Sequence, residues 1–251
     1  MRSLIDTHCH TISSGHAYST VQEYAREANN KGLQMIAITD HGPEMPGGPH
    51  IFHIANQRVI PEKIYGVEIL KGVEANIMNC EGELDIPERI LKRLDLVIAS
   101  LHDVCITPGS IEENTKAICK AMENDYIDII GHSGNPMYPI DKEQIVLKAK
   151  ETNTIIEINN SSLKHKGSRA GSMDNCYEIA KLCKDHGVKI VLGSDAHISF
   201  DVGKLDVATD MLSKIGMPEN LIMNLDTKRL KEYLTKKGKT RFMESTNVPT
   251  V

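Results

Sequence analysis

Short apolar runs rich in β-branched residues alternate along the chain with amphipathic stretches. This alternation is typical of repeated strand–helix units built around a parallel sheet. Most of the runs are continuously apolar, as expected for parallel strands that are buried on both faces. We therefore predict seven strands, at residues 4–7, 35–39, 69–73, 96–100, 127–131, 154–158 and 189–193.

Apolar residues recur at three- and four-residue spacing in the stretches between these runs, which indicates amphipathic helices. We predict helices near residues 20–31, 110–123, 141–152, 172–187 and 227–237. Side chains that can cap a helix stand at four of the predicted starts, with Gln, Glu or Asn three residues later. These N-cap candidates are Thr20, with Ser19 before it, Ser110, Asp141 and Ser172. Gly32 and Gly187 are placed to end two of the helices.

The length of 251 residues suits a barrel of alternating strands and helices, so we predict an α/β fold with one domain over residues 1–251. There are 29 basic and 34 acidic side chains, and the net charge of -5 argues against a nucleic-acid partner. The sequence has no secretory signal pattern and no apolar run long enough for a membrane span, which predicts a cytoplasmic protein. Its six cysteines form no C-x-x-C pair, which indicates reduced thiols rather than a zinc ribbon.

The side chains that can bind metal ions stand where the predicted strands end. In a parallel barrel the carboxyl ends of all strands lie on one face, so residues distant in sequence converge there. Alternate residues of a strand share one side, so His8 and His10 can bind one ion while Cys9 points away, and Asp195 and His197 repeat this spacing. The resulting candidate ligands are His8, His10, His16, His41, Glu74, His102, His132, Asp195 and His197. We predict a metal site from this cluster.

Other histidines fall outside this pattern. His50 and His53 share one loop, His165 lies in another loop, and His186 lies near the end of a predicted helix. We interpret these four as solvated surface residues. A role of His50, His53 or His165 in facing the substrate stays open.

The segments around the predicted strand ends contain longer motifs, namely Asp6-Thr7-His8-Cys9-His10, His16-Ala17-Tyr18-Ser19-Thr20, Ile38-Thr39-Asp40-His41-Gly42, Gly72-Val73-Glu74-Ala75-Asn76, Glu157-Ile158-Asn159-Asn160-Ser161-Ser162 and Gly193-Ser194-Asp195-Ala196-His197. These motifs resemble those of one protein family, the PHP (polymerase and histidinol phosphatase) superfamily, and within it the YcdX-type phosphatases. The likeness extends from about residue 4 to about residue 235.

This resemblance implies a distorted barrel of seven strand–helix units with a trinuclear metal centre. The ions are usually zinc, with manganese or iron in some relatives. The resemblance assigns one ion to His8, His10, Glu74 and Asp195, a second to His16, His41 and His197, and a third to His102 and His132 with Glu74 bridging. Every ligand position of the family pattern is occupied in this sequence.

The charge of such a centre favours an anionic substrate. Three divalent ions would carry six positive charges, and Glu74 and Asp195 would offset two of them. A phosphate dianion and a metal-bound hydroxide would offset most of the remainder, so we predict hydrolysis of a small phosphomonoester. Asp40 would orient His41 or assist proton transfer, and we favour the orienting role. The loop at residues 159–171 contains Lys164, His165, Lys166 and Arg169, of which Arg169 is our candidate for gripping the phosphate, although a merely solvated loop fits equally well.

Four alternatives remain from the sequence, of which metal-dependent amide hydrolysis on a similar barrel has no sequence signal in its favour. A histidinol-phosphate phosphatase would differ only in substrate. A phosphodiesterase or exonuclease is disfavoured by the net negative charge and by the lack of a basic, aromatic-rich segment. A metal-binding domain without catalysis would need fully occupied ligand sets, whereas catalytic sites keep an open position. The sequence leaves a homo-oligomer open and does not distinguish among small-molecule substrates.

Overall fold

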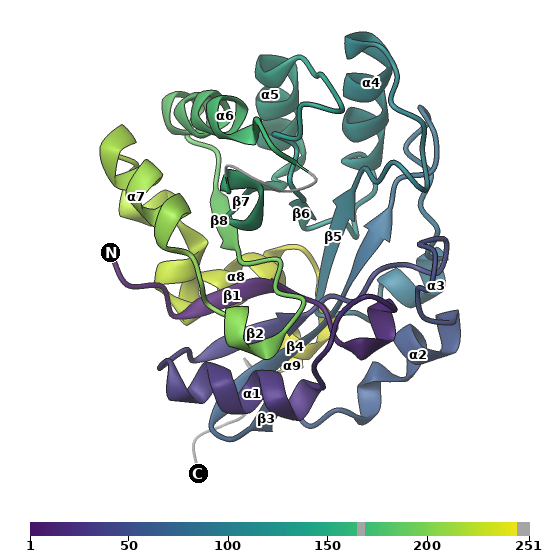
Figure 1. Ribbon diagram of the computed structural model, residues 1–251, viewed down its shortest axis with the longest axis vertical. Helices are drawn as coiled ribbons and strands as arrows, with labels where there is room; N and C mark the ends of the chain where they lie inside the picture. The colour runs from purple at the N-terminus through teal and green to yellow at the C-terminus, as the bar shows by residue number, and fades with distance from the viewer. Residues whose placement is uncertain (165–168, 245–251) are drawn as a thin grey trace.

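The structure, a computed structural model that describes residues 1–164 and 169–244, is a barrel of parallel strands surrounded by helices (Figure 1). The hydrogen-bonded strand order is β1-β2-β4-β5-β6-β7-β8, and every pairing along this path is parallel. The strands are β1 (Ile5–Cys9), β2 (Met35–Ile38), β4 (Val67–Asn76), β5 (Leu96–Ser100), β6 (Ile129–Ile130), β7 (Ile155–Asn159) and β8 (Ile190–Gly193). The predicted α/β barrel with seven parallel strands is confirmed.

The first and last strands bring the barrel close to closure. The backbone N–H of His10 donates to the carbonyl of Ala196 at 2.9 Å, and Cys9 and Ala196 form an isolated parallel bridge. A short strand that the sequence pattern did not predict, β3 (Lys63–Ile64), pairs antiparallel with the start of β4.

Helices cover the outside of the strands (Figure 1). Five of them match predicted helices, namely α1 (Val21–Asn30), α4 (Ile111–Ala121), α5 (Lys142–Thr152), α6 (Ser172–His186) and α8 (Thr227–Lys236). The remaining helices were not predicted: α2 (Ile51–Ala55), α3 (Glu88–Leu91), α7 (Asp206–Ile215), α9 (Thr240–Glu244) and six 3-10 turns, η1 (Ile12–Ser14), η2 (Asn56–Val59), η3 (Ser161–Leu163), η4 (Ser199–Asp201), η5 (Glu219–Leu221) and η6 (Met223–Leu225).

Three of the four predicted N-caps are confirmed. Thr20 and Ser110 form capping boxes with Glu23 and Glu113, and the Asp141 side chain accepts from the N–H of Gln144. The prediction for Ser172 was wrong, because the N-cap of α6 is Gly171 and the Ser172 hydroxyl donates to the carbonyl of Arg169. Gly187 caps the end of α6 in the left-handed conformation, and Gly32 follows α1 with φ of 73°.

The interior of the barrel is apolar at its amino-terminal end. Inward side chains of the strands pack there on Leu230, Tyr233, Leu234 and Phe242, so the segment that carries α8 and α9 closes this end. A second core fills the space between the strands and helices α3 to α7, and a third lies under α1. The carboxyl-terminal end of the barrel is therefore left for polar side chains.

All six cysteines are free, as predicted. None of the helices within residues 1–164 and 169–244 combines the length and the apolar composition that a membrane span requires.

Candidate metal centre

The barrel interior changes from apolar to polar along individual strands. In β4, Leu70 packs in the inner core, and the later residues of the same parity are Gly72, Glu74 and Asn76. In β7, Ile155 packs in that core and is followed at alternate positions by Glu157 and Asn159. These polar side chains are buried. The strand period thus places carboxylates and amides directly above an apolar floor.

An irregularity in β1 directs two histidines into the interior. Ile5 belongs to the inner core, whereas Cys9 packs in the core under α1, and the pairing of β1 with β2 shifts register between Asp6 and Cys9. His8 stands an odd number of residues after Ile5, so a regular strand would turn it outward. The shift acts as a bulge that re-aims the side chain, and both His8 and His10 approach Glu74.

The buried carboxylate of Glu74 lies at the centre of the predicted cluster. Its Oε2 atom faces three imidazoles: His8 Nε2 at 3.3 Å, His10 Nε2 at 3.4 Å and His41 Nδ1 at 2.9 Å. Its Oε1 atom faces the other two, His132 Nε2 at 2.8 Å and His102 Nε2 at 3.3 Å. The two oxygens therefore point to separate groups of histidines, which is the arrangement that a bridging carboxylate requires.

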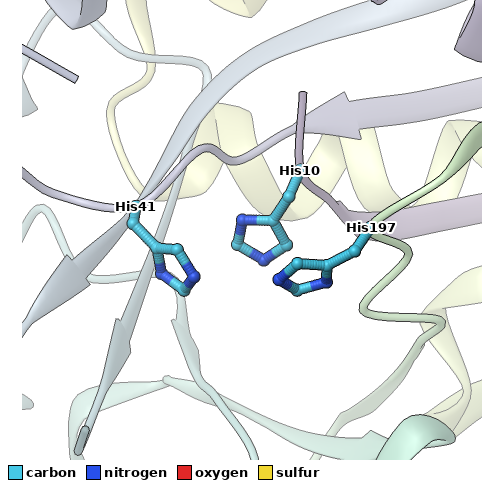
Figure 2. Close-up of side chains that lie close together, drawn as sticks. All are labelled: His10, His41 and His197. Carbon is cyan, nitrogen blue, oxygen red and sulfur yellow. The ribbon is translucent and has the colours of Figure 1, made fainter. Parts of the chain in front are cut away.

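A further group of imidazoles lies beside this carboxylate. Figure 2 shows the rings of His10, His41 and His197 turned toward one another from the ends of β1, β2 and β8. His16 joins them, with its Nε2 atom 3.0 Å from Nε2 of His197. With Asp195, whose Oδ1 atom lies 3.3 Å from His10 Nε2, all nine predicted ligands are brought together. The groups whose ligand atoms lie nearest to one another differ from the implied ligand sets, however. One such group is His10, His41 and His197, and another is His41, Glu74 and His102.

The residues present fit a metal site. Among the described residues, four buried atoms of the cluster have no hydrogen-bond partner, namely His8 Nε2, His10 Nε2, His41 Nδ1 and Glu74 Oε2. Buried polar atoms without a partner carry a large desolvation cost, and cations offset that cost when the atoms are lone-pair donors. Imidazole nitrogens with a few carboxylates are the ligands of zinc and other transition metals rather than of calcium or magnesium.

Most of the titration shifts favour the forms that bind metal. Burial lowers the pKa of His10 well below its usual value and the pKa of His132 to about 4, so both imidazoles are neutral at pH 7. Burial alone would raise the pKa of Glu74, but the surrounding histidines, His8 first, hold it well below its usual value. His8 differs, because Glu157, Glu74 and Asp195 outweigh the effect of burial and raise its pKa well above 6.5.

Hydrogen bonds to the opposite ring nitrogens orient several of these imidazoles. His8 Nδ1 lies 2.7 Å from Glu157 Oε1, and His102 Nδ1 lies 2.7 Å from Asn76 Oδ1. His10 Nδ1 lies 3.1 Å from the hydroxyl of Ser14. Such contacts leave Nε2 of each ring for a metal ion. The sequence placed Glu157 at a strand end but did not predict its contact with His8. The feature that could have indicated it is a second polar residue, Asn159, two positions later on the same side of a buried strand.

Asp195 presents one oxygen to the cluster and one to Arg169. Its Oδ1 atom lies 3.3 Å from His10 Nε2, while Oδ2 accepts from the Arg169 guanidinium. Burial would raise the pKa of Asp195, but the charge of Arg169 and then that of His8 hold it well below its usual value. Asp195 and His132 also have positive φ, 52° and 28°. Backbone strain of this kind concentrates at functional sites.

The contacts of Asp40 differ from those expected. Its carboxylate accepts from the N–H and hydroxyl of Thr11 and from the hydroxyl of Ser14, and it lies 3.5 Å from His53 Nε2. Ser14 in turn accepts from the backbone N–H of His41 and contacts the His10 ring. Asp40 therefore reaches both histidines through Ser14, and its carboxylate contacts Thr11, Ser14 and His53.

The other histidines and the basic loop residues noted in the sequence differ in whether they reach the cluster. His50 is exposed and caps α2, His53 contacts Asp40, and His186 lies 3.9 Å from Glu143 on the surface. None of the three lines the cavity over the cluster within the described part of the chain, whereas Lys164 and Arg169 do. That cavity has a volume of about 590 Å³. His165 and Lys166 lie outside the described residues.

Comparison with known proteins agrees with this arrangement. The sequence profile of the PHP domain matches residues 6–167. A protein named as a probable phosphatase from Thermoanaerobacter sp. (strain X514) is 59% identical over 238 residues, which cover 94% of this chain and 96% of the relative. Another so named, from Clostridium acetobutylicum, is 55% identical over 241 residues, covering 96% and 98%.

The fold is also similar to that of a solved structure, the histidinol phosphate phosphatase of Lactococcus lactis complexed with zinc, L-histidinol and phosphate. The TM-score is 0.58 at 18% sequence identity, over 87% of this chain and 95% of that one. At this identity the likeness concerns the fold alone. The profile match and the extent of the sequence identity lead to one conclusion: this chain belongs to the PHP domain family.

Proposed function

We propose that this protein is a metal-dependent phosphatase that hydrolyses a small phosphomonoester, with three divalent ions held by Glu74 and the eight other candidate ligands around it. The observation that carries the proposal is the pair of histidine groups on the two oxygens of that one buried carboxylate. Zinc is the metal that the ligand set favours, and manganese or iron are the alternatives. The names of the relatives, probable phosphatases, support the reaction class.

An open cavity above the cluster supports an enzyme rather than a structural metal domain. A structural zinc site is closed by side chains, whereas a catalytic site keeps access for substrate. Here His41, Glu74 and His132 line a cavity of about 590 Å³. When bound, the ions would lower the pKa of a water molecule and offset the charge of the phosphate.

The chain's own residues would bind and orient the phosphate. Arg169 lines the cavity and donates to Asp195 through Nη2. A guanidinium has five N–H donors, so the others can donate to phosphate oxygens. Asp40 would act at a distance by holding Ser14, which contacts His10 and the backbone of His41. We assign Asp40 a positioning role for these reasons.

Substitution of two ligands tests the proposal. His41→Ala and Asp195→Ala should each abolish hydrolysis of phosphomonoesters while circular dichroism shows a retained fold. His186→Ala and Asp210→Ala are matched controls, because both side chains lie on the surface, outside the residues that line the cavity. Full activity of either ligand variant would contradict the proposal.

A further inference from the structure

Exposed apolar side chains stand at the mouth of the cavity. Tyr18 is 77% exposed, Val104 55%, Met137 43% and Ile198 36%, and all four line the cavity. Single exposed apolar residues are common on protein surfaces, but their gathering around a concave site with polar residues beside them marks a ligand-binding surface. Asp103, Lys164 and Asp201 are the charged residues beside them.

These side chains form two walls, each held by a hydrogen bond between loops. Tyr18 follows β1 and Ile198 follows β8, and the N–H of Tyr18 donates to the carbonyl of His197 at 2.8 Å. Val104 follows β5 and Met137 follows β6, and the Tyr138 hydroxyl donates to the carbonyl of Ile106 at 2.7 Å. The walls are therefore preformed rather than loose.

The sheet order places the two walls on opposite sides of the metal cluster. β8 and β1 are the ends of the strand path and meet where the barrel closes, whereas β5 and β6 are neighbours in the middle of that path. In a ring of seven strands these two junctions face each other across the barrel. A molecule with its phosphate on the cluster would extend between the walls.

The chemistry of the cavity changes from its floor to its mouth. The floor carries Glu74, His132 and Asp195, and Arg169 is beside them, while the mouth carries the apolar walls. The volume of about 590 Å³ lies within the range of about 300–1,000 Å³ for small-molecule sites, and a phosphate group alone would leave much of it unfilled. An amphiphilic ligand with one phosphate end and one apolar end matches this division.

We infer that the substrate is a phosphomonoester of an apolar alcohol, bound with its hydrocarbon part between the Tyr18–Ile198 wall and the Val104–Met137 wall. This inference rests on the proposed function and names the substrate class of the same site. A substrate whose alcohol is a sugar or another polyol would place its hydroxyl groups against the apolar walls. Contact of these groups with the walls would add little binding free energy.

A series of n-alkyl phosphates from methyl to hexyl phosphate tests the inference, because the reactivity of the leaving alcohol changes little along it. We expect kcat/KM to rise about twofold for each methylene group, since full burial of one corresponds to about fourfold and the walls cover each from two sides only. Glycerol phosphate should be a poorer substrate than propyl phosphate. A flat series with measurable hydrolysis would overturn the inference and leave the phosphatase proposal intact, whereas no hydrolysis of any phosphomonoester would overturn both.

Substitutions in the two walls test whether these side chains cause the rise of kcat/KM with alkyl length. The double substitution Tyr18→Ser with Met137→Ser should flatten the alkyl series, and Phe200→Ser should keep its slope. Phe200 is a matched control because it is 66% exposed on the segment after Ile198 without lining the cavity. Calorimetric binding of hexylphosphonate and methylphosphonate gives a readout that needs no turnover. Equal affinity of the two phosphonates, or a steep slope in the double variant, would contradict the inference.

Discussion

The Nδ1 atom of His8 lies 2.7 Å from Oε1 of Glu157, and neither side chain is exposed to solvent. Glu157 also accepts from the backbone N–H of His132 at 2.8 Å. One carboxylate beneath the cluster thus fixes the ring of one candidate ligand and the backbone of another. In this arrangement His8 keeps its proton on Nδ1, which leaves Nε2 to face Glu74 and Asp195.

Glu157→Gln should weaken metal binding by about ten- to a hundredfold. The amide keeps the volume of the side chain but can donate to His8 Nδ1, which favours the tautomer with its proton on Nε2. Competition with a chromophoric chelator measures the affinity. The matched control is Glu88→Gln, at an exposed position on α3. Unchanged affinity in Glu157→Gln would show that the His8–Glu157 contact has no part in metal binding.

Gly193→Ala should disrupt the centre by crowding. A Cβ atom at Gly193 would collide with Glu157 Oε1 and lie 2.9 Å from His8 Cβ. We expect loss of bound metal and a lower melting temperature. At Gly187 nothing lies within 4 Å of an added Cβ, so Gly187→Ala should cost only about 1–2 kcal/mol for its left-handed backbone and retain the metal. Equal metal content in both variants would contradict the steric argument.

The sequence predicted the seven parallel strands and the nine candidate ligands because both depend on strong local patterns. Continuous apolar runs identified the strands, and the histidines that follow several of them identified the carboxyl-terminal end of the barrel as the candidate site. It did not predict β3, which is two residues long, or α7, which follows Leu205 without a side-chain cap. It also misplaced the cap of α6, because Gly171 there has a left-handed backbone rather than a capping side chain.

The contacts of the site could not be predicted to the same extent, since they depend on tertiary geometry. The bulge that turns His8 inward appears only in the pairing of β1 with β2. The acceptors for the histidine rings come from other strands and loops, as Glu157 does for His8 and Asn76 for His102. The contacts of Asp40 could not be predicted for the same reason, because it reaches His41 through Ser14, which lies on a different loop.

Metal uptake should depend on pH through His8. Its pKa is raised well above 6.5, so in the metal-free protein at pH 7 this ring carries a second proton, on Nε2, besides the proton on Nδ1. The Nε2 proton must leave before that nitrogen binds an ion. The affinity should therefore increase from about pH 6 to about pH 8. Calorimetric titrations in buffers of different ionisation enthalpy should detect proton release. An affinity independent of pH over this range would contradict the assignment of His8 as a ligand.

Arg169→Ala should raise KM for a phosphomonoester about ten- to a hundredfold, the effect of losing hydrogen bonds from a charged donor. Because Arg169 also contacts Asp195, metal content must be measured in the same preparation. Arg89→Ala is the control, at an exposed position on α3 that does not line the cavity. An unchanged KM in Arg169→Ala would favour the interpretation of its loop as merely solvated.

Lys239→Met should destabilise the fold by about 3–5 kcal/mol without touching the metal site. The Lys239 ammonium lies 2.7 Å from Asp128 Oδ2, and both side chains are buried where the C-terminal segment closes the barrel. The variant leaves the Asp128 carboxylate buried without its partner. Urea unfolding measures the loss, and adding Asp128→Asn should recover part of it. A stability equal to that of the parent protein would contradict the structural role of the pair.

Reconstitution of the metal-stripped protein tests the central claim, that the histidines around Glu74 hold several ions that act on a phosphomonoester. Zinc would be titrated into the stripped protein while bound zinc per chain and hydrolysis of hexyl phosphate are followed together. We predict no hydrolysis without zinc and full hydrolysis as binding approaches three ions per chain. Hydrolysis by the stripped protein, or a chain that binds no transition metal, would contradict the account.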